Sequence, residues 1–326
     1  MDKNYKYLYQ KYKKKYLLAK KNHLLGGLRL ATAKPNSKNS NELKLLYKDQ
    51  SKFQKIRLYQ KNNDFWLTLN DQIQFHSKEY KISHTLQAVV PVKKFKPKKI
   101  LILGGGDCIN AAFILKFPFV ESVTLVEIDQ KVIDMVRETE IMKKITNNVL
   151  DDERLNIIIG DATEFVINCK EKYDFIIDDV EYGFTNQPNK DIDFFQYMKK
   201  KLSITDTLTF VMPDSDIIDE KQNYKKEFPA FYKIYEKKNK NLFEKKNLNN
   251  LTSSDLDKLD YDLYTGNIID IFKEVKFPKS FLKKLENDNI LQDFKVYLSA
   301  YEYGIFEKID YGFEMYFTIH RLSLLN

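Results

Sequence analysis

Cysteine, histidine and long apolar runs are all scarce in this 326-residue sequence. The two cysteines, Cys108 and Cys169, fall in a predicted helix and at a helix end, so we expect no disulfide framework and a cytoplasmic location. The four histidines are scattered along the chain, which predicts that no metal is bound. No run is apolar and long enough to predict a membrane span.

Acidic residues are outnumbered, and the excess positive charge lies mostly at the N-terminus. The sequence has 54 basic and 46 acidic side chains, and residues 1–28, with eight lysines and one aspartate, carry +7 of the net +8. We therefore expect residues 1–42 to be a basic leader helix and linker, followed by a nearly neutral body for which nucleic acid is not an expected partner.

The leader is rich in lysine and tyrosine and ends in Gly26-Gly27. It resembles leaders of giant DNA virus proteins, and a viral origin would make the host cytoplasm its location. Four of its five tyrosines, Tyr5, Tyr9, Tyr12 and Tyr16, fall on one face of the predicted helix. It could contact an acidic surface or be a solvated appendage.

Residues 43–92 show short alternating runs separated by asparagine-containing turns. This pattern predicts a small antiparallel β-domain with strands at 45–47, 55–59, 65–69 and 73–75. A helix over 83–90 and a basic linker over 93–99 then lead to a third part, residues 93–326.

The third glycine of a dinucleotide-binding fingerprint is also missing. A buried strand at 100–103 runs into Gly104, Gly105 and Gly106, followed by a helix over 108–116. Ile109 occupies the position of the third glycine, which disfavours a nicotinamide dinucleotide. The glycines still allow the backbone to approach a ligand closely at the start of a helix.

Carboxylates follow four predicted strands in succession. Asp107 follows the first strand, and Glu127, Asp161 and Asp179 end or follow strands at 122–129, 155–159 and 173–177. In a doubly wound, mostly parallel α/β sheet these strand ends share one edge, where ligands bind. Such acids suit an adenosine-type ligand with a cationic group, although each could instead cap the next helix.

The rest of the chain predicts a helix over 191–202 and a strand over 207–212. An insertion at 213–275 and an antiparallel pair at 294–302 and 312–320 follow. Lysines and aromatics interleave over 221–246. Aromatic side chains among lysines could stack on nucleic-acid bases, but at helical spacing they more often form one apolar face that packs against the core.

The ordered motifs resemble the spermidine synthases, the polyamine aminopropyltransferases, from about residue 43 to 212. These motifs are Ser51-Lys52-Phe53-Gln54, the stretch Leu67–Gln74, Gly104-Gly105-Gly106-Asp107, Val126-Glu127-Ile128-Asp129, Gly160-Asp161-Ala162 and the stretch Tyr173–Asp179. The resemblance implies a class I methyltransferase-like Rossmann fold that binds decarboxylated S-adenosylmethionine, or S-adenosylmethionine itself. It further implies a small polyamine as partner and a homodimer.

The resemblance also implies roles for individual residues. Gln74 and Asp107 would contact the aminopropyl or sulfonium end, Glu127 the ribose, and Asp161 with Ala162 the adenine. Asp179 would take the proton of the attacking amine. The full implied cofactor set is Gln54, Gln74, Gly104, Gly105, Gly106, Asp107, Glu127, Ile128, Asp161 and Ala162, and the implied substrate set is His84, Glu181 and Tyr182.

Departures from the family pattern fall in the polyamine half of the site. Ser83-His84-Thr85 replaces a triplet that usually begins with tyrosine and ends with glutamate, Tyr182 replaces a second acid, and Cys108-Ile109 replaces a glycine pair. Three functions follow: an aminopropyltransferase with a putrescine-like acceptor, an S-adenosylmethionine-dependent methyltransferase, or a non-catalytic protein that binds the nucleoside.

Overall fold

The computed structural model describes residues 43–180, the strands at 207–211, 294–304 and 311–321, parts of 252–270, and the single positions 229 and 283. All of them belong to one compact unit, Leu43–Asn326. The predicted leader helix, the helix at 191–202 and most of the insertion lie outside the described residues, as do Glu181 and Tyr182.

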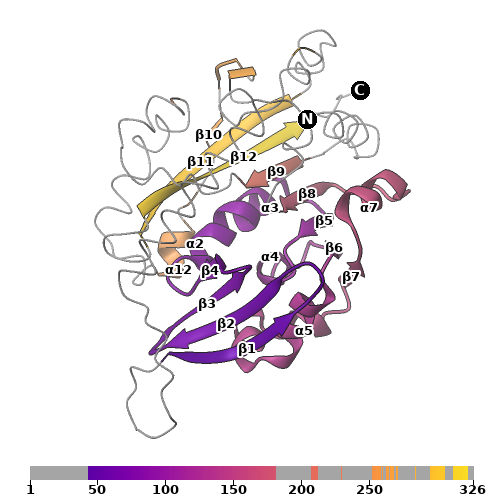
Figure 1. The fold of residues 1–326 in the computed structure, drawn as a ribbon. Coiled ribbons are helices and arrows are strands. Elements are labelled where there is room, and N and C mark those ends of the chain that lie inside the picture. The colour runs from indigo at the N-terminus through magenta and orange to yellow at the C-terminus, as the bar shows by residue number, and fades with distance from the viewer. Residues whose placement is uncertain are drawn as a thin grey trace, which may run out of the picture. The chain divides into compact units, whose positions relative to one another are not determined.

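The first part of the unit is a four-stranded antiparallel sheet in sequential order, as the alternating runs predict (Figure 1). Its strands are β1 (Lys44–Gln50), β2 (Lys55–Lys61), β3 (Asp64–Leu69) and β4 (Gln72–His76). One face is apolar and buried, and Ile56, Leu58, Leu67 and Phe75 are each at most 1% exposed. Asn62 and Asn70, at φ 55° and 51°, make the turns.

The second sheet has eight strands in the order β10-β11-β12-β9-β8-β5-β6-β7. Five pair in parallel: β5 (Lys99–Gly104), β6 (Ser122–Glu127), β7 (Leu155–Ile159), β8 (Phe175–Asp179) and β9 (Thr207–Val211). The antiparallel strands are β10 (Asp262–Leu263), β11 (Phe294–Gly304) and β12 (Tyr311–Arg321). The mostly parallel α/β sheet and its closing antiparallel pair are confirmed, whereas β10 is an unexpected strand within the insertion.

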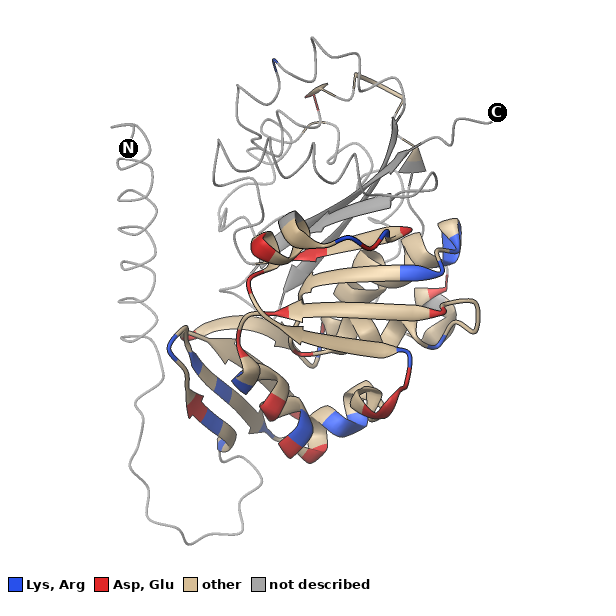
Figure 2. Ribbon diagram, turned by 90° about the vertical axis from the view of Figure 1, so that its right-hand side faces the viewer, with Lys and Arg blue, Asp and Glu red and all other residues tan. Residues whose placement is uncertain are grey.

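Helices follow the parallel strands, and the central strands are buried on both faces. The helices are α4 (Ile109–Ile114), α5 (Gln130–Glu138), α6 (Glu140–Thr146) and α7 (Ala162–Asn168), with a 3-10 turn at Val149–Asp151 and a short helix, α12 (Ser253–Leu256). Figure 2 shows that the described strands of the parallel sheet carry their charged residues at their ends, whereas the antiparallel strands of the first sheet also carry Lys and Arg along their length. This pattern is typical of a parallel sheet covered by helices.

One continuous helical run connects the two sheets. It consists of α2 (Tyr80–His84), a π-helical turn (Thr85–Val89) and α3 (Val90–Phe95). The run begins earlier than the predicted helix and continues past Pro91 to Phe95, so the predicted linker at 93–99 is too long. Pro91 is the second residue of α3, the helix that lies directly after the π-helical turn.

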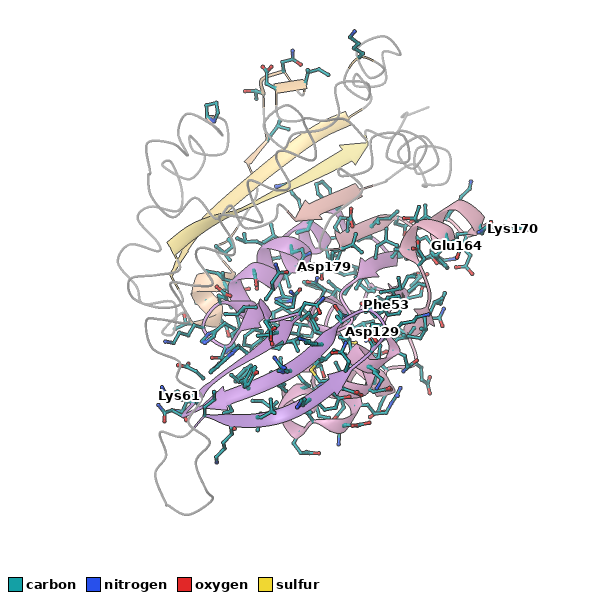
Figure 3. The ribbon with its side chains drawn as sticks, viewed as in Figure 1. Phe53, Lys61, Asp129, Glu164, Lys170 and Asp179 are labelled. Carbon is teal, nitrogen blue, oxygen red and sulfur yellow. The ribbon has the colours of Figure 1, made fainter. Side chains whose placement is uncertain are left out.

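Asp129 joins the loop after β1 to the parallel sheet. Its Oδ2 accepts hydrogen bonds from Ser51 Oγ at 2.6 Å and from Gln54 Nε2 at 3.1 Å. Its Oδ1 accepts from the backbone N–H of Lys131 at 3.2 Å and so caps α5. Figure 3 labels Asp129 and Phe53, which belongs to the same loop as Ser51 and Gln54. Within the described part of the chain, every helix is too short or too polar to cross a bilayer.

Candidate active site

The turn between β5 and α4 forms the floor of the candidate site. Gly104 and Gly105 have φ of +80° and +67°, a conformation that side chains rarely adopt. A β-carbon on Gly104 would lie 2.4 Å from the backbone oxygen of Asp179, so the two strand ends approach too closely for any other residue. Asp107 Oδ1 accepts from the backbone N–H of Ile109 at 2.9 Å, which holds the carboxylate at the start of α4.

Glu127 lies at the end of β6 and is only 7% exposed. Its Oε1 accepts from the backbone N–H of Asp129 at 2.8 Å, and its Oε2 accepts from the N–H of Gly106 at 3.1 Å. Burial raises the pKa of Glu127 to about 7, and the charges of Asp129 and Asp107 add to the rise. Each carboxylate oxygen has a second lone pair, so Glu127 can accept one further hydrogen bond at each oxygen.

Asp179 ends β8, the strand next to β5 (Figure 3). Its Oδ1 accepts from Gln87 Nε2 at 2.9 Å and its Oδ2 from Asn110 Nδ2 at 3.3 Å. Burial, followed by the charge of Asp107, raises the pKa of Asp179 to about 6, although both amides and His84 oppose the rise. A carboxylate with this pKa can take up a proton near neutral pH.

His84, the last residue of α2, is buried and faces Asp107. Its Nε2 lies 3.8 Å from Asp107 Oδ2, and its Nδ1 lies 2.7 Å from the backbone oxygen of Tyr80. Burial lowers the pKa of His84, but its interactions with Asp107, Asp179 and the Tyr80 carbonyl outweigh burial and leave the pKa above its usual value. The two carboxylates therefore favour the protonated form of His84.

Asp161 and Ala162 begin α7, after β7. Asp161 is exposed, and its Oδ1 caps the helix by accepting from the backbone N–H of Glu164 at 3.0 Å. Ile128, next to Glu127, is 41% exposed. These residues share the sheet edge with Asp107, Glu127 and Asp179, because β8, β5, β6 and β7 are neighbours in the sheet and run parallel.

The two predicted glutamines lie in the antiparallel sheet and its loops. Gln54 donates to Asp129, as described above, and does not contact the Asp107–Asp179 pair. Gln74, on β4, is exposed, and its Nε2 makes a long contact of 3.5 Å with the backbone oxygen of Gln72.

The sequence interpretation missed Gln87 and Asn110, although both contact Asp179. Gln87 is 4% exposed in the π-helical turn, and Asn110 is 0% exposed in α4. Each interrupts a segment of mostly apolar residues, and that interruption was the signal available in the sequence. No pattern of spacing could connect residues that lie 69 and 92 positions away from Asp179.

The arrangement combines an acceptor for two hydroxyl groups with concentrated negative charge. Glu127 can accept two hydroxyls, and Asp107 with Asp179 would attract a cation. In the residues that the structure describes, no group of three or more histidine, cysteine or acidic side chains is placed to hold a metal ion.

Comparison with known proteins identifies related sequences and folds. Residues 79–237 match the spermine/spermidine synthase domain. Polyamine aminopropyltransferase 2 of Aquifex aeolicus is 34% identical over 161 residues, covering 48% of this chain and 32% of that protein. The enzyme of the same name from Bacillus cereus is 37% identical over 135 residues, covering 41% and 37%. The chain thus matches about a third of the length of these relatives.

The fold also has counterparts among solved structures. A crystal structure of a spermidine synthase in complex with the transition-state analogue AdoDATO aligns with a TM-score of 0.53 and 22% identity, covering 86% of this chain and 73% of that one. The spermidine synthase of Thermotoga maritima gives the same values. At 22% identity, this similarity is evidence for the fold alone.

Proposed function

We propose that this chain, whose residues 79–237 match the spermine/spermidine synthase domain, is an aminopropyltransferase. It would move the aminopropyl group of decarboxylated S-adenosylmethionine to a di- or polyamine with a putrescine-like end. The observation that carries the proposal is the Asp179 carboxylate at the end of β8, held by two amides beside Asp107.

The nucleoside would bind along the edge formed by β5, β6 and β7. Glu127 would accept the two ribose hydroxyls on the oxygen positions that its backbone hydrogen bonds leave open. Asp161 and the backbone of Ala162 would bind the adenine, with Ile128 beside it. Gln54, Gln74, Asp107 and the three glycines would complete the contacts, with Asp107 near the positively charged sulfonium group.

The reaction needs an unprotonated amine in line with a carbon bonded to the sulfonium. The amine nitrogen forms a bond to that carbon as the carbon–sulfur bond breaks, and methylthioadenosine leaves with the electron pair. Asp179 would accept the proton that the amine loses, because its pKa of about 6 lets it ionise at neutral pH and still receive a proton. His84, Glu181 and Tyr182 would lie on the acceptor side.

A single assay separates this proposal from its alternatives. The purified protein is incubated with decarboxylated or intact S-adenosylmethionine and a panel of amines, and the products are identified by mass spectrometry. Methylthioadenosine formed from the decarboxylated compound supports aminopropyl transfer. S-adenosylhomocysteine formed from the intact compound would indicate a methyltransferase, and calorimetric binding without any product would indicate a non-catalytic family member.

The resemblance also supports a homodimer in the cytoplasm. Light scattering of the purified protein tests whether it is a homodimer, and fluorescence microscopy of a tagged chain tests whether it is cytoplasmic.

Three segments, at 1–42, 43–92 and 93–326, remain our proposed domain division, with the insertion at 213–275 inside the third.

A further inference from the structure

A π-helical turn places Gln87 next to the proposed catalytic acid. The turn spans Thr85–Val89, and the backbone N–H of Val90 bonds to the oxygen of Thr85, five residues back. Pro91 follows directly, and the ring of a proline inside a helix would crowd the carbonyl four residues back, which belongs to Gln87. A wider turn relieves this crowding, and π-helical turns are frequent at functional sites.

Gln87, Asn110 and Asp179 form a closed triangle of hydrogen bonds. Gln87 Nε2 donates to Asp179 Oδ1 at 2.9 Å, and Asn110 Nδ2 lies 3.3 Å from Asp179 Oδ2. The same Asn110 nitrogen donates to Gln87 Oε1 at 2.9 Å, so the two amides fix each other. The carboxylate therefore has one amide donor at each oxygen.

The amide of Asn110 is an unfavourable group at this position in the core. Its neighbours in α4, Ile109 and Ala111, are also 0% exposed, and an apolar side chain would suit the same place. Asn110 Oδ1 is buried and accepts no hydrogen bond within the described part of the chain. An unpaired buried oxygen destabilises a fold, and such groups are retained most often where function needs them.

We propose that Gln87 and Asn110 are positioning residues that hold the Asp179 carboxylate in one orientation toward the acceptor amine. Rotation of the carboxylate would break both hydrogen bonds at once. A β-carbon at Gly105 would lie 3.1 Å from Asp179 Oδ2, so the glycine turn also borders the carboxylate closely. This inference rests on the proposed function, because orientation matters only if Asp179 receives a proton.

The two amides also act on the charge of Asp179. Both donate N–H groups, which favour the ionised carboxylate, and the positive charge of His84 acts in the same direction. Burial and the negative charge of Asp107 act in the opposite direction. Loss of either amide should therefore raise the pKa of Asp179 further and leave less of the ionised base at neutral pH.

Carbon-13 NMR of protein labelled at the aspartate carboxyl groups tests this inference without any turnover. The resonance missing from Asp179→Asn assigns Asp179, and its titration midpoint is compared among wild type, Gln87→Met and Asn110→Leu. We expect each variant to raise the midpoint by about half a pH unit or more. Gln130→Met is the matched control, because Gln130 makes a 2.9 Å bond to Asp134 on the exposed surface of α5.

Kinetics then separate positioning from packing. We expect both variants to lower kcat about tenfold or more with little change in the KM for the nucleoside, and to move the acidic limb of the rate profile by the shift that NMR measures. Gln87→Glu, which keeps the side-chain length, is the second variant if Gln87→Met fails to fold. The inference would be overturned if the titration midpoint of Asp179 stayed at its wild-type value in these variants, or if it moved while kcat kept its wild-type value. A wild type without turnover would instead contradict the proposed function, and the NMR midpoints would remain measurable.

Discussion

The backbone N–H of Gly106 donates to Oε2 of Glu127 at 3.1 Å, and a β-carbon on Gly106 would lie only 2.6 Å from the same oxygen. The carboxylate of Glu127 therefore packs directly against Gly106, and any larger residue at position 106 would displace it.

Gly106→Ala should displace Glu127 and weaken nucleoside binding about tenfold or more, because the carboxylate loses a charge-assisted hydrogen bond. Calorimetry with methylthioadenosine measures the loss. Gly160→Ala is the matched control for folding, since a β-carbon there meets no atom within 4 Å. Wild-type affinity in Gly106→Ala would show that Glu127 does not hold the ribose.

Nucleoside affinity should rise with pH through the titration of Glu127. Its pKa is raised to about 7, so the carboxyl is mostly protonated at pH 6 and cannot accept both ribose hydroxyls. Affinity for methylthioadenosine should therefore increase about tenfold between pH 6 and pH 8 and then level off. Glu127→Gln has no ionisable group and should show weak binding without this rise. The same rise in Glu127→Gln would assign the pH dependence to another residue.

Asp179→Asn should reduce turnover by about 10²–10⁴-fold, because the amide cannot take the proton of the amine. Nucleoside affinity should change only a few-fold, since Asp179 is not expected to contact the ribose or the adenine. Steady-state kinetics and calorimetry measure the two effects separately. Asp134→Asn, on α5, removes a negative charge away from the site and controls for net charge. Unchanged turnover in Asp179→Asn would remove this acid from the mechanism.

Cys108 has φ 62°, in the left-handed region, although it carries a side chain. Both Cys108→Gly and Cys108→Ala remove the same buried sulfur, but only glycine adopts this φ without strain. The glycine variant should therefore be more stable than the alanine variant by about 1 kcal/mol, the reverse of their usual order at a helix. Chemical denaturation measures the difference, and the usual order would show that Cys108 is unstrained.

Asp129→Ala should destabilise the fold by more than the loss of a helix cap alone would. The cap itself contributes about 1 kcal/mol, and Ser51 and Gln54 would each lose their acceptor, so we expect a total loss of about 2–4 kcal/mol. Asp161→Ala is the matched control, because Asp161 also caps a helix, α7, through its side chain but is exposed. Equal losses in the two variants would mean that the Ser51 and Gln54 bonds contribute nothing to stability.

The sequence predicts the strands of this fold well, for a clear physical reason. The edge strand at Leu155–Ile159 is a short, mostly apolar run between polar turns, and its predicted bounds match the structure. The carboxylates that follow these strands reach one edge because parallel neighbours end together. Asp161 also shows that the helix-cap interpretation of such an acid is correct for at least this position.

Other features depend on contacts that no local pattern records. Gln87 and Asn110 meet Asp179 only after three distant elements have packed together. The π-helical turn adds a second difficulty, because a regular helical period misassigns the direction of each side chain beyond the wider turn. Strand β10 has two residues and pairs with β11 far along the chain, so its sequence carries no recognisable strand pattern.

The wider turn at Thr85–Val89 sets how the helix before it is rotated relative to the helix after it. Deleting one residue from this turn would restore a regular helix and rotate everything before it by about 100° relative to everything after it. A single in-frame codon deletion would thus disengage Gln87 from Asp179 and displace His84 from Asp107, although Asp179 itself would stay at the end of β8. Conversely, inserting one residue into a regular helix creates a π-helical turn, and protein engineers can use such an insertion to turn a side chain toward a catalytic acid.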